Sequence, residues 1–186
     1  IGDLVAAGKL RRVRGKGTFV APSPLVSRLH LASFSEEMAQ QRVHAASEIL
    51  RAATAPPPPQ VAAFFGTPPE TPHIQLRRLR LGDGEPYAVD HAWYNAQLVP
   101  DLLAHDVKQS VYSLLETRYG LPITEAEQTV TAASATEANA PLLDVAPGTA
   151  LLHIARFARS GAHAVEYCVS LYRSDRYWLT TRVGRC

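Results

Sequence analysis

Residues 73–95 read HIQLRRLRLGDGEPYAVDHAWYN, and this segment is the clearest indication of the fold class. Two strand-like runs, residues 73–81 and 87–95, flank the sequence Gly-Asp-Gly-Glu-Pro at residues 82–86. A glycine-containing turn between two such runs is typical of a β-hairpin. The stretch therefore predicts two antiparallel strands in the middle of the chain.

Segments on both sides extend this pattern. Ser33 and Glu36 have the spacing of a capping box, which predicts that a helix begins there. Gly66 and Gly120 stand where two further helices are expected to end. We expect helices at residues 33–41, 61–65, 110–119 and 136–143, and further strands at residues 45–50, 124–133, 149–159, 164–173 and 177–183. Hairpins with helices between them predict an α+β fold with a mostly antiparallel sheet and flanking helices.

Basic charge is concentrated at the N-terminal end. Residues 1–20 hold five basic side chains and one acidic side chain, whereas the rest of the chain holds 14 basic and 16 acidic ones. Two short runs around Gly15-Lys16-Gly17 predict a second β-hairpin with a basic tip, which the prolines at 22 and 24 end. This distribution indicates that the N-terminal end meets a polyanion and that the remainder has another task.

Arg78 and Arg80 are two residues apart on a predicted strand, so their side chains point to the same side of the sheet. Two guanidinium groups on one face repel each other unless an anion lies between them, and their planar shape suits phosphate or carboxylate. The pair indicates an anion site, an exposed basic edge strand, or pairing with Asp90 on the neighbouring strand. The pattern leaves these three interpretations open.

Other polar residues also stand at positions where a ligand can bind. Glu166, Ser170 and Tyr172 share one face of the last predicted hairpin, and such a face lines either solvent or a cavity. Ser110 and Ser33 stand at helix starts, where unpaired backbone N–H groups form either an anion site or a plain helix cap.

Two segments resemble a known family of regulators. Residues 7–20 resemble the wing of the winged helix-turn-helix in GntR-family repressors, and the remainder resembles the UTRA domain, the effector domain of the HutC subfamily, whose fold is similar to that of chorismate lyase. The motifs that carry the resemblance are LASFSEEM at 31–38, RLR at 78–80, GEP at 84–86, SVY at 110–112, VEY at 165–167 and YRSDRY at 172–177. The resemblance implies three parts: residues 1–22 as the remnant of a winged helix-turn-helix domain (helix end and wing), residues 23–32 as a linker, and residues 33–186 as the UTRA effector-binding domain.

The resemblance implies that the wing contacts DNA. The residues that it assigns to this contact are Arg11, Arg12, Arg14, Lys16 and Gly17. Contacts between a wing and DNA phosphates position a protein on DNA without reading the base sequence. The recognition helix of the family, which reads the bases, would precede residue 1. We therefore expect operator DNA to be a partner of the full-length parent, and the absence of an initiating Met at Ile1 leads us to expect that the chain begins inside a longer one.

The resemblance also implies an effector pocket. Its residues here are Ser33, Phe34, Arg78, Arg80, Asp90, Ser110, Tyr112, Glu166 and Tyr172. The two arginines, Ser110 and Tyr112 would hold a phosphate, whereas the two acidic residues and Tyr172 would bind sugar hydroxyls or an amide. We expect a small anionic metabolite, with a hexosamine phosphate such as N-acetylglucosamine 6-phosphate as the leading candidate. A homodimer is expected because the family acts on two-fold operators, and the apolar run at residues 151–155 is our candidate interface.

Composition limits the other classes. Hydrophobic residues make up 46% of the chain and charged residues 19%, which is typical of a globular protein. No apolar run reaches the ~18 residues of a membrane span, and no signal peptide is visible. Cys168, Cys186 and the scattered histidines lack metal-ligand spacing, so we expect no metal and no cofactor. The reduced cytoplasm is the expected compartment.

Two other functions stay open beside the sensor. A chorismate lyase-like enzyme needs an activated acid/base pair, for which Asp90 and Glu166 are the candidates. A dimerisation module that binds no small molecule needs no polar pocket. Thermal melting with candidate metabolites separates the three, because a sensor is stabilised, an enzyme turns over its substrate, and a structural module does not respond. We expect a sensor with no catalytic residues.

Overall fold

A six-stranded antiparallel sheet forms the body of the protein. The computed structural model describes residues 1–3, 10–13, 17–20, 24–27 and 31–181. The strand order is β4-β5-β6-β9-β8-β7. The strands are β4 (Ala45–Ala55), β5 (His73–Gly82), β6 (Glu85–Tyr94), β7 (Glu125–Ser134), β8 (Ala150–Ser160) and β9 (His163–Arg173). The expected α+β fold with a mostly antiparallel sheet is confirmed.

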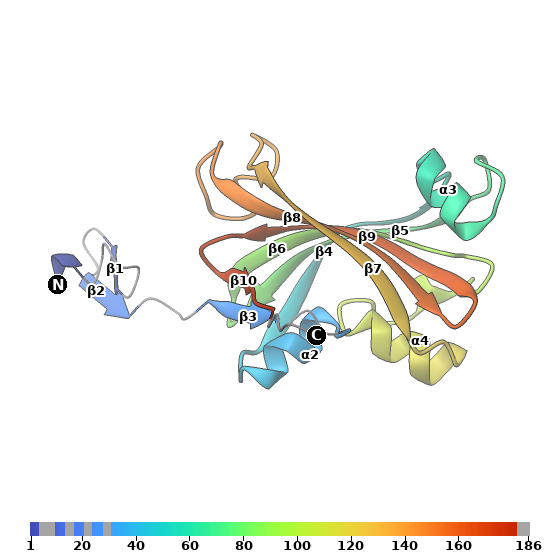
Figure 1. Ribbon diagram of the computed structural model, residues 1–186, viewed down its shortest axis with the longest axis horizontal. Helices are drawn as coiled ribbons and strands as arrows, with labels where there is room; N and C mark the ends of the chain where they lie inside the picture. The colour runs from blue at the N-terminus through green and yellow to red at the C-terminus, as the bar shows by residue number, and fades with distance from the viewer. Residues whose placement is uncertain (4–9, 14–16, 21–23, 28–30, 182–186) are drawn as a thin grey trace, which may run out of the picture.

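Helices cover the two faces of the sheet unequally. In Figure 1, α2 (Phe34–Gln40) and α4 (Val111–Tyr119) lie below the sheet, while α3 (Pro59–Phe65) lies above one end of it. A short 3-10 helix, η1 (Leu102–Ala104), precedes α4. The longest of these helices, α4, has nine residues, so no helix in the described part of the chain approaches the ~20 residues that cross a membrane.

The predicted start and stop signals of the helices are confirmed. The Glu36 N–H donates to Ser33 Oγ at 3.3 Å, and the Ser33 N–H donates to the Glu36 carboxylate at 2.6 Å, which completes the capping box. Gly66 and Gly120 follow α3 and α4 in the left-handed conformation, with φ of 69° and 65°. Glycine suits these positions because it has no Cβ to disfavour a positive φ.

The helix expected at residues 136–143 is wrong, because this segment consists of consecutive turns. Thr136 Oγ1 does accept a hydrogen bond from the Asn139 N–H at 3.3 Å, as a helix cap would. Pro141 has no N–H to donate and disfavours a helical backbone at the residue before it. The segment therefore makes turns and does not continue as a helix, and its Leu143 is fully buried.

A separate two-stranded sheet pairs β3 (Leu25–Ser27) in parallel with β10 (Tyr177–Leu179). β3 lies within residues 23–32, where we expected only a linker, and both of its end residues are buried. Three residues after a proline are too few to show the alternation of a strand. β10 ends earlier than the expected Val183 because its partner β3 is equally short.

The two expected strands of the N-terminal hairpin are confirmed. β1 (Leu10–Val13) pairs antiparallel with β2 (Gly17–Val20). Arg14 and Lys16, at the predicted basic tip, lie outside the described residues. The role of this hairpin as a wing therefore stays a prediction.

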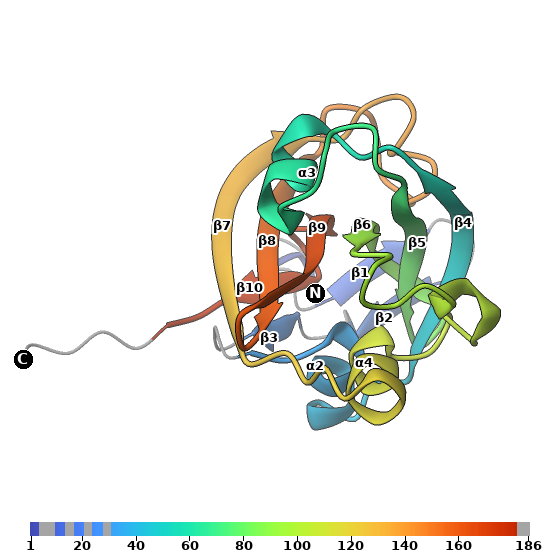
Figure 2. The ribbon, with the colours of Figure 1, turned by 90° about the vertical axis from the view of Figure 1, so that its right-hand side faces the viewer.

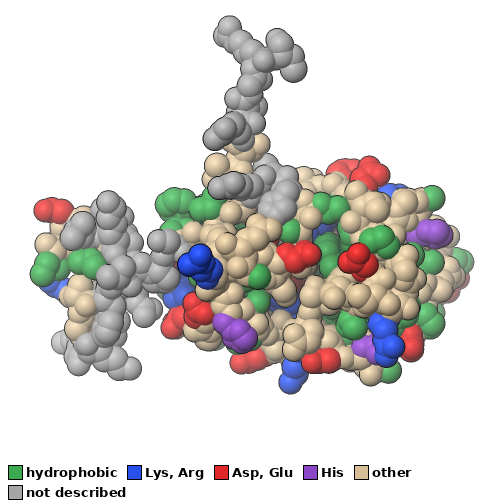
Figure 3. Space-filling view, turned by 90° about the horizontal axis from the view of Figure 1, so that it is seen from below, with side chains coloured by type: hydrophobic (Ala, Val, Ile, Leu, Met, Phe, Trp, Pro, Cys, Tyr) green, Lys and Arg blue, Asp and Glu red, His purple; other side chains and the backbone are tan. Residues whose placement is uncertain are grey.

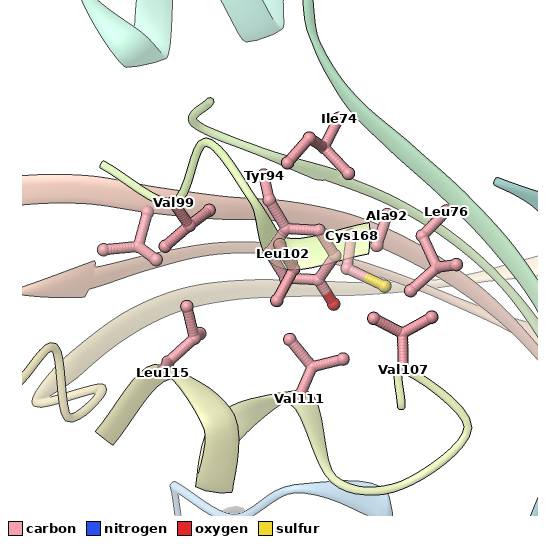
Figure 4. Packing of buried hydrophobic residues seen from close by; sticks show 11 residues of the cluster. Ile74, Leu76, Ala92, Tyr94, Val99, Leu102, Val107, Val111, Leu115 and Cys168 are labelled. Carbon is pink, nitrogen blue, oxygen red and sulfur yellow. The ribbon is translucent and has the colours of Figure 1, made fainter. Parts of the chain in front are cut away.

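The core between the sheet and α4 is built around Tyr94 (Figure 4). The Tyr94 side chain is fully buried, and Leu102 and Leu115 pack in the same cluster. Burying each such side chain contributes about 1.5–3 kcal/mol. The Tyr94 hydroxyl has no hydrogen-bond partner among the described residues, and it belongs to the wall of the cavity that lies beside this core.

Candidate functional site

A cavity lies between the middle of the sheet and the first turns of α2 and α4. It encloses about 60 Å³, which is room for roughly four water-sized spheres. Its lining residues are Ala32, Ser33, Phe34, Glu37, Arg78, Arg80, Asp90, Tyr94, Ser110, Val111, Tyr112, Ile154, Arg156, Glu166, Cys168, Ser170, Tyr172 and Tyr177. Figure 3 views the molecule from the side of α2 and α4, where the described acidic and basic side chains are interspersed.

Two arginines in the cavity share one carboxylate. Arg78 Nη2 and Arg80 Nε lie 3.8 and 3.7 Å from the same oxygen, Asp90 Oδ2. The other oxygen, Asp90 Oδ1, accepts a hydrogen bond from Ser170 Oγ at 2.7 Å. All four residues are buried. This cluster therefore carries two positive charges against one negative charge.

The arginine pair is incompletely hydrogen-bonded. Arg78 Nη1 donates to the carbonyl of Val107 at 3.1 Å, but Arg78 Nε and both Nε and Nη1 of Arg80 have no hydrogen-bond partner among the described residues. The Arg80 guanidinium lies 4.5 Å from the centroid of the Phe34 ring. Burial, and then the neighbouring charge of Arg78, lower the pKa of Arg80. Each buried donor without a partner costs about 1–3 kcal/mol, so these donors are open to an acceptor that the described side chains do not supply.

A second polar group in the cavity wall consists of Tyr112, Glu166 and Arg156, which are linked by hydrogen bonds. The Tyr112 hydroxyl donates to Glu166 Oε2 at 2.7 Å. Burial and the charge of Glu166 raise the pKa of Tyr112 well above its ordinary value, so the hydroxyl stays a donor. Arg156 donates to the carbonyl of Ala32 at 3.2 Å, to the Tyr112 hydroxyl at 3.4 Å, and twice to Gln128 Oε1 at 2.7 and 3.0 Å. This group offers donors and an acceptor to polar atoms of a ligand.

Two helix starts meet at the cavity. Ser33 caps α2, and Ser110 caps α4 by accepting the Ser113 N–H at 3.3 Å. The hydroxyls of Ser33 and Ser110 are also hydrogen-bonded to each other at 3.4 Å. The interpretation of both serines as helix caps is therefore confirmed, and the caps bring the positive ends of two helices to one place.

A protein-family model matches most of this chain. Residues 40–178 match the model of the UTRA domain, and this match covers 139 of the 186 residues. The chain belongs to the UTRA domain family. The predicted resemblance to GntR-type regulators of the HutC kind is thereby confirmed.

Relatives of this UTRA domain are named transcriptional regulators. The repressor NagR of Bacillus subtilis is 28% identical over 180 residues, which cover 95% of this chain and 74% of NagR. The mannosyl-D-glycerate system repressor MngR of Escherichia coli is 24% identical over 180 residues, covering 96% of this chain and 75% of MngR. The crystal structure of PhnF from Mycobacterium smegmatis has the same fold, with a TM-score of 0.83 at 24% identity, and covers all of this chain and 82% of PhnF. The chain is an effector domain of a transcription regulator.

The cavity of this UTRA domain brings together all nine residues that the sequence assigned to an effector pocket. The interpretation of Arg78 and Arg80 as an exposed edge is wrong, because β5 is an inner strand and both side chains are buried. The interpretation of the Glu166 face as solvent-exposed is wrong for the same reason. Pairing of the arginines with Asp90 is confirmed, whereas a role of these residues in binding an effector stays a prediction.

Two further expectations concern other surfaces. Of the predicted wing residues, Arg12 is exposed on β1, Arg11 and Gly17 belong to the paired strands, and Arg14 and Lys16 lie outside the described residues. The apolar run at residues 151–155 lies on β8, an inner strand between β9 and β7, where Leu151 and Ile154 are buried; its role in a dimer interface stays a prediction.

Sequence reasoning missed several residues of the cavity wall, of which Arg156 is the most polar. Arg156 follows the buried Ile154 by two positions, so both point to the same face of β8. That spacing was visible in the sequence. Its meaning depends on the register with β9, which places Arg156 opposite Cys168. Glu37 and Tyr177, which are hydrogen-bonded to each other at 3.1 Å, were missed because they lie 140 residues apart.

Proposed function

We propose that the cavity is the sensor site of a repressor and that it binds a small anionic metabolite, with a hexosamine phosphate such as N-acetylglucosamine 6-phosphate as the leading candidate. The observation that carries the proposal is the buried Arg80, whose Nε and Nη1 have no hydrogen-bond partner among the described residues. A phosphate offers several acceptor oxygens and about two negative charges, which suits two arginines that share one aspartate.

The hydrogen-bonded group of Tyr112, Glu166 and Arg156 supports a sugar as the rest of the ligand. Glu166 presents a carboxylate acceptor, and Tyr112 and Arg156 present donors around it. Hydroxyl or amide groups of a sugar can exchange into such a network without leaving a buried charge unpaired. Tyr172, which stacks on Tyr177 with ring centroids 3.9 Å apart, supplies an aromatic wall.

The size of the cavity supports a coupled movement. Its 60 Å³ is far below the ~300 Å³ at which ligand pockets begin, so a sugar phosphate enters only when a wall shifts. We assign this shift to residues 32–34, which lead into α2. In the same helix Glu37 accepts hydrogen bonds from the hydroxyls of Ser27 in β3 and Tyr177 in β10. Moving α2 therefore pulls on β3, the strand closest in sequence to the N-terminal hairpin.

The remaining parts of the proposal concern partners. We propose that residues 1–22 belong to a DNA-binding domain, that residues 23–32 connect it to the UTRA domain at 33–186, and that operator DNA is bound by the full-length parent. A homodimer is proposed because two-fold operators are read by two-fold proteins. A ligand controls such a protein only through different affinities for its two conformations, and the shift of α2 supplies that difference.

Calorimetry with three matched probes tests the sensor. N-acetylglucosamine 6-phosphate should bind, inorganic phosphate should bind more weakly, and N-acetylglucosamine without phosphate should bind weakest. The order follows from the charge-assisted hydrogen bonds of the arginine pair, each of which contributes about 1.5–3 kcal/mol. Equal affinity for the sugar with and without phosphate would overturn the assignment of the arginines. Binding of none of the three would overturn the ligand class.

A further inference from the structure

The hydroxyl of Tyr94 is a buried polar group that needs a partner. Tyr94 ends β6, four residues after Asp90, so both side chains point to the same face of the sheet. Tyr94 belongs to the cavity wall and is fully buried, and its hydroxyl makes no hydrogen bond to a described residue. Because buried polar groups in proteins are nearly always hydrogen-bonded, this hydroxyl is open to an acceptor that enters from outside the protein.

The core fixes the position of this hydroxyl. The Tyr94 ring packs in the cluster that contains Leu102 and Leu115. In Figure 4 its oxygen points toward Val111 and Cys168, both of which also line the cavity. The ring cannot shift without opening a packed core, so the hydroxyl can only rotate about its own C–O bond. An acceptor for it must therefore come to the hydroxyl through the cavity.

A hydrogen-bond acceptor lies next to this donor. Tyr94 is directly opposite Glu166 in the register of β6 and β9. Burial, and then the charge of Glu166, raise the pKa of Tyr94 well above its ordinary value, so the hydroxyl keeps its proton. Glu166 accepts the Tyr112 hydroxyl at Oε2, and a carboxylate can accept further hydrogen bonds beside this one. The cavity wall therefore presents one donor and one acceptor side by side.

We propose that Tyr94 and Glu166 together recognise an acylamino group on the ligand, and that they select an N-acylated sugar phosphate over one with a free amine. This selection rests on the sensor proposed above. The carbonyl oxygen of the acylamino group accepts from the Tyr94 hydroxyl, and its N–H donates to the Glu166 carboxylate. The methyl end of the acyl group packs against Val111 and Cys168, because a buried thiol behaves as a small apolar group.

A free amine fits the same place less well. It is protonated at neutral pH and can only donate, so it leaves the O–H of Tyr94 without an acceptor. It also adds a positive charge where Arg78 and Arg156 already act on the charge of Glu166. A site that hydrogen-bonds a polar group of its ligand discriminates against an analogue that leaves a buried partner unpaired.

Calorimetry with N-acetylglucosamine 6-phosphate and glucosamine 6-phosphate tests the selection, because these two probes differ only at the nitrogen. The parent should bind the acetylated probe more tightly. In Tyr94→Phe, which removes only the hydroxyl, the ratio of the two affinities should fall about 3- to 10-fold, the size of one neutral hydrogen bond. The urea midpoint of the ligand-free variant should stay the same or rise, since the hydroxyl has no described partner to lose.

Tyr167→Phe is the matched control. Tyr167 packs near α3, which Figure 2 shows on the side of the sheet away from α4, and its hydroxyl accepts from Gln60 at 3.0 Å. This control should keep the parent's affinity ratio and lower the urea midpoint.

The outcomes separate the selection from the sensor. A parent that prefers the amine, or a Tyr94→Phe protein with the parent's ratio, overturns the selection while the sensor stands. A lower urea midpoint in Tyr94→Phe would also overturn it, because the hydroxyl would then have a partner within the protein. Binding of neither probe to the parent overturns the sensor, and the selection with it.

Discussion

Replacing Arg80 by methionine should make the ligand-free protein more stable and the sensor insensitive to phosphate. Methionine is close to arginine in length and carries no charge, so Arg80→Met fills the same space beside Phe34. The two buried donors that lack a partner, Nε and Nη1, disappear with the guanidinium. The substitution also removes the charge repulsion between Arg80 and Arg78, while Asp90 keeps its contacts with Arg78 and Ser170.

The expected size of the effect follows from these contacts. Two unpartnered donors at about 1–3 kcal/mol each exceed the loss of the cation–π contact with Phe34, which is worth up to about 2 kcal/mol. The carboxylate of Asp90 lies 3.7 Å from Arg80, too far for a hydrogen bond, so losing this ion pair costs little. We expect a net gain of about 1–2 kcal/mol in the free energy of unfolding, which is a rise in Tm of roughly 2–8 °C. Affinity for a phosphorylated ligand should fall about 10- to 100-fold.

Urea denaturation and calorimetry on the same preparation measure both effects. The matched control is Arg77→Met, because Arg77 points to the other face of β5 and donates to Asn139 Oδ1 at 2.8 Å. The control should lose about 1 kcal/mol of stability and keep its affinity for ligand. An Arg80→Met protein that is less stable than the parent would identify Arg80 as a structural residue. Unchanged affinity would remove the anion site from the cavity.

Two other perturbations test the surroundings of the site. Tyr112→Phe removes the donor to the buried Glu166, so the free energy of unfolding should fall by about 1–3 kcal/mol in urea denaturation; an unchanged value would mean that Glu166 finds another donor. His73 is fully buried, accepts the Ala96 N–H at Nδ1 and therefore donates from Nε2 to Thr67, and burial lowers its pKa below 6.5. Below pH 6.5 the unfolded chain binds a proton at His73 more readily than the folded chain does. The free energy of unfolding that neutral His73 contributes is therefore fully present above pH 6.5 and is lost as the pH falls below it. In His73→Gln, the free energy of unfolding from urea denaturation should depend less on pH below 6.5. An equal dependence on pH in both proteins would assign it to another titrating group.

Local signals in the sequence predicted the sheet and most helix ends because each depends on neighbouring residues. The Ser33 capping box and the glycines after α3 and α4 are interactions within four residues, and their geometry is confirmed. The turns at 136–143 show the limit of such signals, because a cap at Thr136 does not make a helix when Pro141 follows. β3 shows another limit, because a three-residue strand is stabilised by β10 at the far end of the chain.

From the sequence, only the residues of the cavity that share a face of one strand could be predicted, because side chains alternate between the two faces of a strand. Period two placed Arg78 and Arg80 on one face, and placed Glu166 with Tyr172 on one face of another strand. That these two faces are the same face depends on the register of β5, β6 and β9, which pairs Arg78 with Asp90 and Asp90 with Ser170. Arg156 enters the cavity through the register of β8, and no local pattern reports that.

Asp90 explains how two arginines can lie close together while some of their hydrogen-bond donors have no partner among the described residues. We expected Asp90 to bind sugar hydroxyls, but one of its oxygens is occupied by Ser170 and the other lies 3.7–3.8 Å from both guanidinium groups. At that distance it lowers the repulsion between Arg78 and Arg80, while their donors remain available. A longer acid reaching hydrogen-bond distance would satisfy the arginines and compete with a bound phosphate. The short side chain thus leaves the donors of both arginines available, which is what the proposed anion site requires.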